Sequence, residues 1–289
     1  EGIGKSTFAW KMLESLLLQT TGSNVENEKI KSEIKSLASP GMFLCERSYD
    51  EKSRRKKKFI TVDEIRKLKS IFSLSSAERN WRVAIIDSGD ELNNSASNAL
   101  LKILEEPPTK SVIIIVSHRP GALSPTIKSR CRKTNLRVLK KKQISKILLS
   151  LDIKMNELTS EDQIYFDSLS EGSVGKAVNI LNYSMIDRFK DCINILNGFP
   201  EFDRVSILKF TALANNDNEA FTCIGSIILK ILSRIALISI SNPYTLSTKD
   251  ELNLVSNLSS CKNLAATCAD LNSELSKSFS ICTALNLDK

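Results

Sequence analysis

Residues that could bind a nucleoside triphosphate stand at the start of this 289-residue chain. The opening EGIGKST matches the second half of the phosphate-binding pattern GxxxxGK[ST]. In such a loop, glycines let backbone N–H groups crowd around phosphate oxygens, lysine reaches the β- and γ-phosphates, and serine ligates Mg²⁺. An apolar helix follows at once, which a chance GKS match would not require. The expected nucleotide-binding residues are therefore Gly2, Gly4, Lys5, Ser6 and Thr7.

Asp87, the second candidate, ends a fully apolar run, VAII. A carboxylate at the end of a buried strand can hold Mg²⁺ through water beside Ser6, although a strand-end acid with no such role is the plainer alternative. ATPases of this build usually place Glu at the next position to orient the attacking water, whereas Ser88 has no carboxylate. Asp90 and Glu91 follow, but neither occupies the expected position. The sequence therefore makes hydrolysis at this site doubtful.

The stretch SHRPGALSPTIKSRC, residues 117–131, follows a second apolar run, IIIV. Ser117 is a small polar residue placed where a γ-phosphate can be sensed. His118 is the only histidine, and because no orienting partner is evident we favour packing or hydrogen bonding over a general-base role. Arg130 lies on an outward loop, where its guanidinium can serve a neighbour's γ-phosphate as an arginine finger. Alternatively, Arg130 is one basic residue among several.

The elements that must position these residues alternate between strand and helix, which is the α/β pattern. Residues 20–40 are polar and are interpreted as a connection. The elements expected around the candidate site are a helix at 5–18, a strand at 41–45, a helix after the capping box Thr61–Glu64, a strand at 81–87, a helix at 93–106 and a strand at 111–117. After Arg137 only helices are expected. We divide the chain into a nucleotide-binding domain at 1–137, a small helical unit at 138–186 and a helical bundle at 187–289.

The first glycine of the phosphate-binding pattern, and the strand that would precede it, lie outside this sequence. In such folds that strand is central in the sheet. The sequence therefore reads as a fragment or a shortened form, and we expect a chain extended upstream to be the more stable of the two. No signal peptide is expected, because the chain opens inside the loop.

The composition is globular, with 42% hydrophobic and 26% charged residues, which excludes a disordered chain. The net charge of +8 favours contact with a polyanion but also serves solubility. A basic run such as Arg54–Lys58 is more often a solvated loop than a DNA contact. Seven cysteines without a CxxC pair and a single histidine indicate reduced thiols in the cytoplasm and no zinc site. The apolar run Cys223–Ile240 carries Lys230 and Arg234 on one helical face, which predicts a packed helix and no membrane span.

Together these motifs resemble the clamp-loader subunits of bacterial DNA polymerase III of the delta-prime type, relatives of the AAA+ ATPases. The combination of NALLKILEEPP with SRC is highly specific, whereas GKST alone is not. The matching pieces cover the first half of the chain in order and are GIGKST at 2–7, ITVDEIRKL at 60–68, VAIIDSGDELNNSASNALLKILEEPP at 83–108, SHRPG at 117–121 and PTIKSRCR at 125–132. The helical second half is similar only in length and class.

The resemblance implies an α/β AAA+ P-loop core that lacks its first strand, a small helical lid and an all-α collar domain that oligomerises. It implies membership of a pentameric loader that opens the ring-shaped sliding clamp and places it on primed DNA. The implied partners are motor and delta subunits, the clamp indirectly, and primer-template DNA. Arg130 would complete the ATP site of a neighbouring motor subunit. Lys5, Ser6 and Asp87 would be remnants of this subunit's own ATP and Mg²⁺ site.

Three departures from the family pattern matter. Ser88 replaces the Glu of motor subunits, and Gly175 stands where they carry a second γ-phosphate-sensing Arg, with Lys176 as a partial substitute. The four-cysteine zinc module of many relatives is missing, since only Cys45 lies in that region. The leading interpretation is a non-motor loader subunit with weak or absent ATPase of its own. An ATP-hydrolysing motor subunit, a P-loop nucleotide kinase and a plain DNA-binding protein remain as alternatives.

Overall fold

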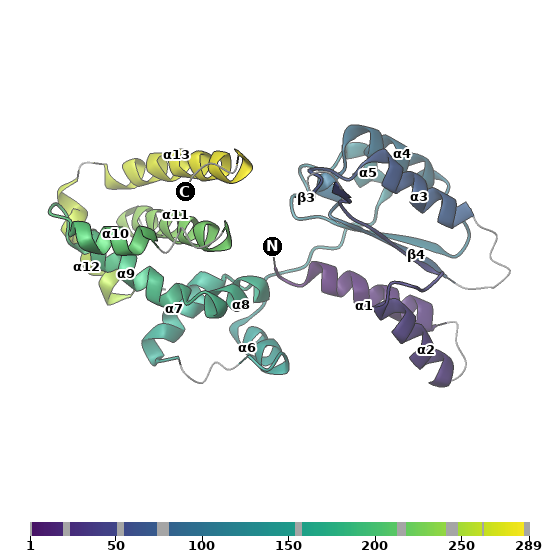
Figure 1. The fold of residues 1–289 in the computed structure, drawn as a ribbon, viewed down its shortest axis with the longest axis horizontal. Helices are drawn as coiled ribbons and strands as arrows, with labels where there is room; N and C mark the ends of the chain where they lie inside the picture. Colours follow the sequence, from purple (N-terminus) through teal and green to yellow (C-terminus); the bar gives the residue numbers. More distant parts are fainter. Residues whose placement is uncertain are drawn as a thin grey trace. The chain divides into compact units, whose positions relative to one another are not determined.

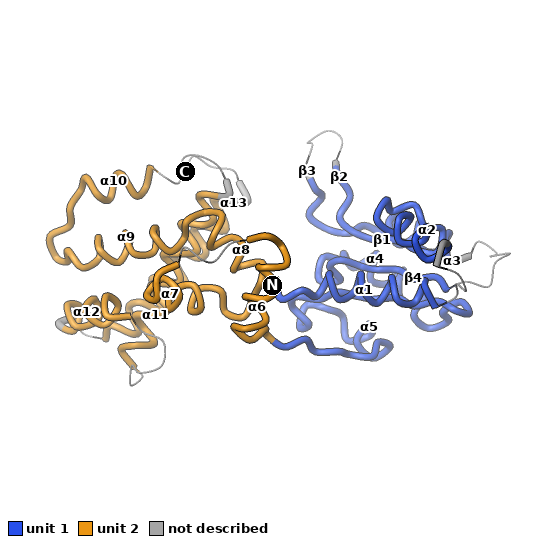
Figure 2. Tube along the Cα trace, turned by 90° about the horizontal axis from the view of Figure 1, so that it is seen from below, with its two compact units in different colours: residues 1, 3–137 blue, residues 2, 138–289 orange. Residues whose placement is uncertain are grey.

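The chain forms two compact units, one made of residues 1 and 3–137 and the other of residues 2 and 138–289 (Figure 2). The computed structural model describes residues 2–19, 24–50, 55–73, 81–153, 158–212, 218–240, 248–261 and 263–285. The first unit is α/β and the second is helical throughout its described residues.

A three-stranded parallel sheet organises the first unit (Figure 1). Its order is β1 (Met42–Cys45), β4 (Arg82–Asp87) and β5 (Ser111–Val116). The central strand β4 pairs on both sides, and Val83 to Ile86 are fully buried, which explains why this strand reads as an unbroken apolar run. A short antiparallel hairpin, β2 (Tyr49–Asp50) with β3 (Arg55–Lys56), follows β1.

Helices cover both faces of this sheet, because neighbouring side chains of a strand point to opposite faces. Val83 and Ile85 face α1 (Lys5–Leu18) and α2 (Asn24–Lys35), while Ala84 and Ile86 face α3 (Val62–Ser73), α4 (Asn94–Glu105) and α5 (Pro125–Arg130). Figure 1 shows the two layers of helices on opposite sides of β4. The result is a three-layer α/β/α sandwich.

Most of the elements expected around the candidate site are confirmed within a residue or two at their ends. Asn93 caps α4 by accepting a 2.8 Å hydrogen bond from the backbone N–H of Ala96, and the helix ends before Pro107-Pro108. The interpretation of residues 20–40 as a connection was wrong, since α2 forms there. Its Ile34 is buried beside Leu13 and Leu17 of α1, so packing stabilises a helix whose sequence is mostly polar.

The second unit contains eight described α-helices around one apolar core. They are α6 (Lys141–Ser150), α7 (Ser160–Ser170), α8 (Val174–Asn182), α9 (Met185–Asn197), α10 (Arg204–Ala212), α11 (Asn218–Ile240), α12 (Lys249–Asn257) and α13 (Leu264–Leu285), with a 3₁₀ turn at Leu258–Ser260. The capping box at Thr248–Glu251 is confirmed at the start of α12. Helix α9 runs across residue 186, so the division of this region into a lid and a collar stays a prediction.

Helix α11 is a packed helix of the second unit. Its segment Ala220–Ile240 is long and apolar enough, by length and composition alone, to cross a membrane. It contacts α9, α12 and α13. Two charged side chains of this segment form ion pairs inside the unit, Lys230 with Glu171 and Arg234 with Glu251.

Candidate functional site

The phosphate-loop residues lead directly into α1. Gly4 precedes the helix with φ of 89°, a left-handed conformation that favours glycine, and Gly2 has φ of 72°. Since no side chain caps the helix, the first backbone N–H groups of α1 are left to an outside acceptor. The positive end of the helix dipole favours an anion at that place. Lys5, Ser6 and Thr7 form the first turn.

Lys5 and Ser117 line the same cleft, which has a volume of about 750 Å³ and lies wholly within the first unit. Apolar side chains of α1 and β5 form much of its wall, and residues 131–136 also line it. Arg130 also lines this cleft. Ser6, Thr7 and Asp87 are not among its lining residues. The cleft is thus lined by one phosphate-loop lysine, the expected sensor serine and the expected finger.

Asp87 and Ser117 lie at the same edge of the sheet. Asp87 is the last residue of β4 and is in register with Val116, the last residue of β5, so that Ser117 follows immediately. Carboxyl ends of neighbouring parallel strands are where ligands bind in open α/β sheets. Ser88 is buried, at 6% exposure.

Asp90, in the 3₁₀ turn η1 (Gly89–Glu91), holds the segment that follows β5. Its Oδ1 accepts a 2.6 Å hydrogen bond from the Ser117 hydroxyl, and its Oδ2 accepts from the backbone N–H groups of His118 and Arg119 and from the Ser88 hydroxyl. Burial alone would raise the pKa of Asp90, but these hydrogen bonds outweigh it and hold the pKa below the usual value for aspartate. The Ser117 hydroxyl is therefore engaged by this carboxylate.

Neither acidic residue after Ser88 is free to activate water. Asp90 carries four donors on its carboxylate. Glu91 forms an ion pair with Arg47, with 2.9 Å between Oε2 and Nε. A general base needs an accessible lone pair aimed at the water it deprotonates. Asp90 and Glu91, which the sequence offered as substitutes for the missing Glu, are therefore engaged in hydrogen bonds and an ion pair.

We expect Asp90→Ala to destabilise the first unit by about 1–3 kcal/mol near neutral pH, because the substitution leaves two backbone N–H groups without their acceptor. The folded pKa of Asp90 is lowered, so its contribution is present above the unfolded pKa and is lost as the pH falls through the folded value. Urea unfolding of both proteins at about pH 7 and about pH 3 checks this, and the difference should shrink in acid. An unchanged difference at low pH would contradict the assignment.

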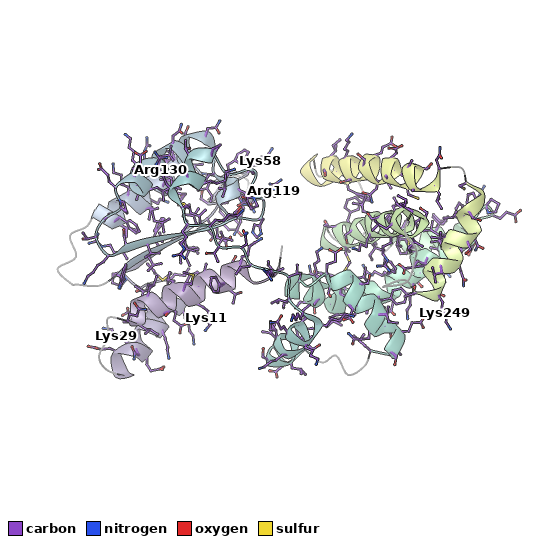
Figure 3. All side chains as sticks on the ribbon, turned by 180° about the vertical axis from the view of Figure 1, so that it is seen from behind. Lys11, Lys29, Lys58, Arg119, Arg130 and Lys249 are labelled. Carbon is purple, nitrogen blue, oxygen red and sulfur yellow. The ribbon has the colours of Figure 1, made fainter. Side chains whose placement is uncertain are left out.

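Arg130 ends α5 and is 35% exposed at its side chain. Nη2 forms a 2.7 Å ion pair with Oε1 of Glu105 at the end of α4, while Nη1 donates to the carbonyl of Thr126. Figure 3 shows Arg130 and Lys11 of α1 on opposite sides of the sheet. Sequence inspection did not identify Glu105 as the partner of Arg130, although the two motifs that carry them were recognised.

His118 has a buried Nδ1 with no hydrogen-bond partner among the described residues. No carboxylate orients its ring there, as a general base would require. Lys176, the expected substitute for a second sensor, forms an ion pair with Glu171 inside the second unit. Burial raises the pKa of the Cys45 thiol to about 12, so this thiol is protonated near neutral pH. Within the described residues there is no group of three or more His, Cys, Asp or Glu side chains that could hold a metal.

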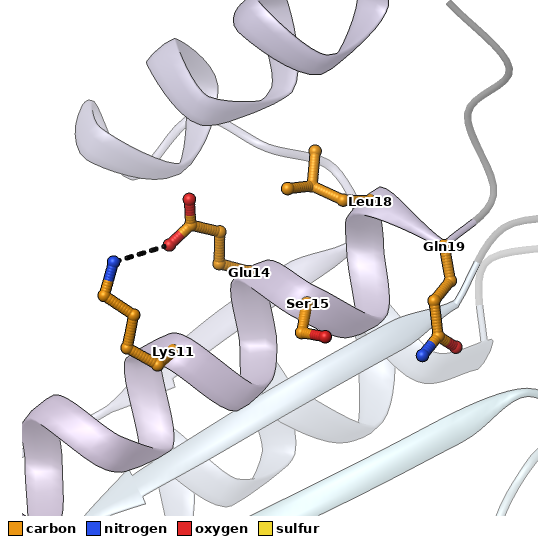
Figure 4. A pocket seen from close by; sticks show the side chains of 5 residues that line it. All are labelled: Lys11, Glu14, Ser15, Leu18 and Gln19. Carbon is orange, nitrogen blue, oxygen red and sulfur yellow. Dashed lines mark hydrogen bonds and ion pairs between the residues drawn. The ribbon is translucent and has the colours of Figure 1, made fainter.

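A second hollow follows α1 and is lined by Lys11, Glu14, Ser15, Leu18 and Gln19 (Figure 4). Lys11 and Glu14 form a 3.2 Å ion pair one helical turn apart. The charges of this hollow therefore neutralise each other, and nothing in it converges on a ligand.

Comparison with known proteins finds similarity to subunits of DNA polymerase III. The family model described as DNA polymerase III, delta subunit, matches residues 1–140. The delta-prime subunit of DNA polymerase III from Pseudomonas aeruginosa is 34% identical over 133 residues, which are 45% of this chain and 38% of that protein. The gamma subunit from Buchnera aphidicola of Schizaphis graminum is 29% identical over 239 residues, 80% of this chain and 62% of that protein.

This chain therefore spans less than two thirds of the length of these two curated relatives. Among solved structures, a DNA polymerase III gamma-subunit-related protein from Thermotoga maritima covers 94% of this chain, with 16% identity and a TM-score of 0.39.

Proposed function

Because residues 1–140 of this chain are similar to delta-prime-type clamp-loader subunits of DNA polymerase III, we propose that it is a non-motor subunit of such a loader. In this role it helps to place the sliding clamp on primed DNA and donates Arg130 to the ATP site of a neighbouring subunit. Its partners are the motor and delta subunits and primer-template DNA, with the clamp contacted indirectly. The complex works in the cytoplasm as part of the DNA polymerase III holoenzyme.

One observation carries the non-motor assignment: the side chains at positions 88, 90 and 91, where a water-activating base is expected, are unsuited or occupied. Ser88 has no carboxylate, Asp90 accepts four hydrogen bonds, and Glu91 is paired with Arg47. Without a positioned base, in-line attack on a γ-phosphate loses the residue that orients its nucleophile. The subunit's own turnover is therefore weak or absent.

Nucleotide binding survives in this proposal even though hydrolysis does not. The uncapped start of α1 and the side chain of Lys5 fit a phosphate group, since they supply backbone N–H donors and a positive charge. Ser6 and Asp87 would hold Mg²⁺, which screens the phosphate charges when bound. Gly4, with φ of 89°, allows the turn of the loop into α1, and Thr7 lies in the first turn of that helix. The segment is thus suited to hold ATP without consuming it.

The isolated chain is expected to show negligible ATP hydrolysis, with or without DNA and with or without an added nucleoside monophosphate. Steady-state phosphate release measures the first condition, and nucleoside diphosphate formation tests the kinase alternative. Equilibrium binding of a fluorescent ATP analogue should persist in the wild type and weaken at least tenfold in Lys5→Ala, since the lysine charge faces the phosphates.

A DNA-stimulated turnover by the chain alone would contradict the non-motor role and favour a motor subunit. Phosphate transfer to the monophosphate would favour a kinase. If the chain neither bound nor hydrolysed the analogue, the proposed role of Arg130 would stand, but the proposal of a remnant nucleotide site would fail.

A further inference from the structure

A short segment after β1 concentrates positive charge. Residues 46–50 and 55–59, called here the basic hairpin, hold five Lys and Arg against two Asp and Glu, a net charge of +3 in a chain of net charge +8. More than a third of the excess charge thus lies in ten described residues. A local basic cluster of this kind is the electrostatic footprint of a polyanion-binding surface.

Exposed aromatic rings lie within the same segment. Tyr49 is 64% exposed, the most exposed aromatic side chain of the described residues, and Phe59 is 46% exposed. Tyr49 is paired with Lys56 across the hairpin, and Lys56 Nζ lies 5.7 Å from the centre of the tyrosine ring. Lys58 Nζ lies 5.6 Å from the centre of the Phe59 ring. A loop that only serves solubility has no need to expose two rings with a cation beside each.

The hairpin also adjoins the end of the sheet where Ser117 lies. The backbone N–H of Ile60 donates to the carbonyl of Glu91 at 2.7 Å, and the N–H of Arg119 donates to Asp90 in the same 3₁₀ turn. Figure 3 labels Lys58 and Arg119 at the same end of the first unit in this view. Arg119 is exposed and extends the basic surface beyond the hairpin.

The acidic groups near this surface do not cancel it. Glu46 pairs with Lys56 at 3.0 Å and Glu91 with Arg47 at 2.9 Å, both in exposed or half-exposed pairs. Such pairs contribute little net free energy in water, so a phosphate can replace the carboxylate. Lys57 and Lys58 are exposed and form no ion pair among the described side chains.

We propose that the basic hairpin binds single-stranded nucleic acid, with Lys57 and Lys58 contacting phosphates and with Tyr49 and Phe59 stacking on bases. Aromatic rings stack on unpaired bases of any sequence, whereas the bases of a duplex are already stacked on one another. Exposed rings with neighbouring cations therefore favour the binding of single strands over duplexes. The inference deepens the proposed clamp-loader role by naming a DNA-contacting surface, but it rests on the charge and rings of the hairpin alone.

The test measures binding of a fluorescein-labelled oligothymidylate of about 20 nucleotides to the isolated full chain by anisotropy, over a range of salt concentrations. Lys57→Ala/Lys58→Ala should weaken binding about tenfold or more at low salt and should reduce the slope of log K against log salt by about 1.4. The matched control is Lys29→Ala/Lys35→Ala on α2, which removes the same charge from the same unit. The control should bind like the wild type.

Stacking is tested separately from charge. Tyr49→Ala should weaken binding by about fivefold to 150-fold with an unchanged salt slope, and Tyr49→Phe should retain binding because the ring remains. Circular dichroism melting confirms that each variant folds. Equal losses in the two lysine pairs, wild-type binding by Tyr49→Ala, tighter binding of a duplex of equal length, or no binding by the wild type would each overturn the proposal. The assay uses no ATP, so its failure would leave the ATPase test of the loader role standing.

Discussion

In the proposed role, Arg130→Ala is expected to lower ATP hydrolysis at one site of the reconstituted clamp-loader complex by about 10³-fold or more, because an arginine finger stabilises charge on the transferring phosphoryl group. The steady-state rate of the whole complex falls less, since the other sites of the ring keep their own fingers. Folding of this chain should survive, because the Arg130–Glu105 pair is half exposed and such pairs contribute at most about 1 kcal/mol. The measurement is single-turnover hydrolysis by complexes that contain wild-type or variant chain.

Two matched variants separate catalysis in trans from local structure. Glu105→Ala breaks the same ion pair but keeps the guanidinium, so its complex should hydrolyse ATP like the wild type. Arg130→Lys keeps the charge but loses the planar pair of donors, and it should restore little of the activity. If Glu105→Ala and Arg130→Ala were equally impaired, Arg130 would act by holding α4 and α5 together, and the finger assignment would fail.

The sheet and its helices were predictable because their local signals agree with their packing. Strand β4 reads as an unbroken apolar run, and the structure buries it on both faces. Helix α4 has a capping asparagine at one end and two prolines beyond the other. The sequence of α2 carries no such signal. Its few apolar side chains stabilise the helix by packing against α1, and this packing cannot be predicted from the sequence of α2 itself.

Only part of the candidate site could be predicted from the sequence. Lys5 and Ser117 were named from motifs, and the structure brings them to one cleft. The hydrogen bonds from the 117–119 segment to Asp90 span 27 to 29 residues, and no periodicity connects positions so far apart. The parallel pairing of the two strands was the missing step, because the register of Asp87 with Val116 places the residues that follow each strand side by side. The partner proposed for Arg130 belongs to another chain, which no single sequence can display.

Glu251→Ala should destabilise the second unit by about 3–5 kcal/mol, because it leaves the Arg234 guanidinium buried without its counter-ion. The side chains of Arg234 and Glu251 are only 14% and 5% exposed. Arg234 reaches Glu251 through Nε and Nη2, the latter at 2.6 Å from Oε2, and also donates to Ser168 of α7. The same carboxylate accepts a 2.9 Å hydrogen bond from the backbone N–H of Thr248 in the capping box of α12. The side chain of Arg234 on α11 thus bonds to side chains of both α7 and α12.

Urea unfolding followed by helical circular dichroism measures the loss, and a double-mutant cycle assigns it to the pair. Arg234→Met/Glu251→Leu should lose less than Arg234→Met or Glu251→Leu alone, since only the double variant removes both buried charges together. Lys11→Ala provides the exposed control, because Lys11 is 75% exposed in its ion pair with Glu14 and should change stability by no more than about 0.5 kcal/mol. If the double variant lost the sum of the two single losses, the charges would not interact in the folded protein. A cost confined to the variants that break the buried pair would show that this ion pair is part of the packing of α11 against α7 and α12.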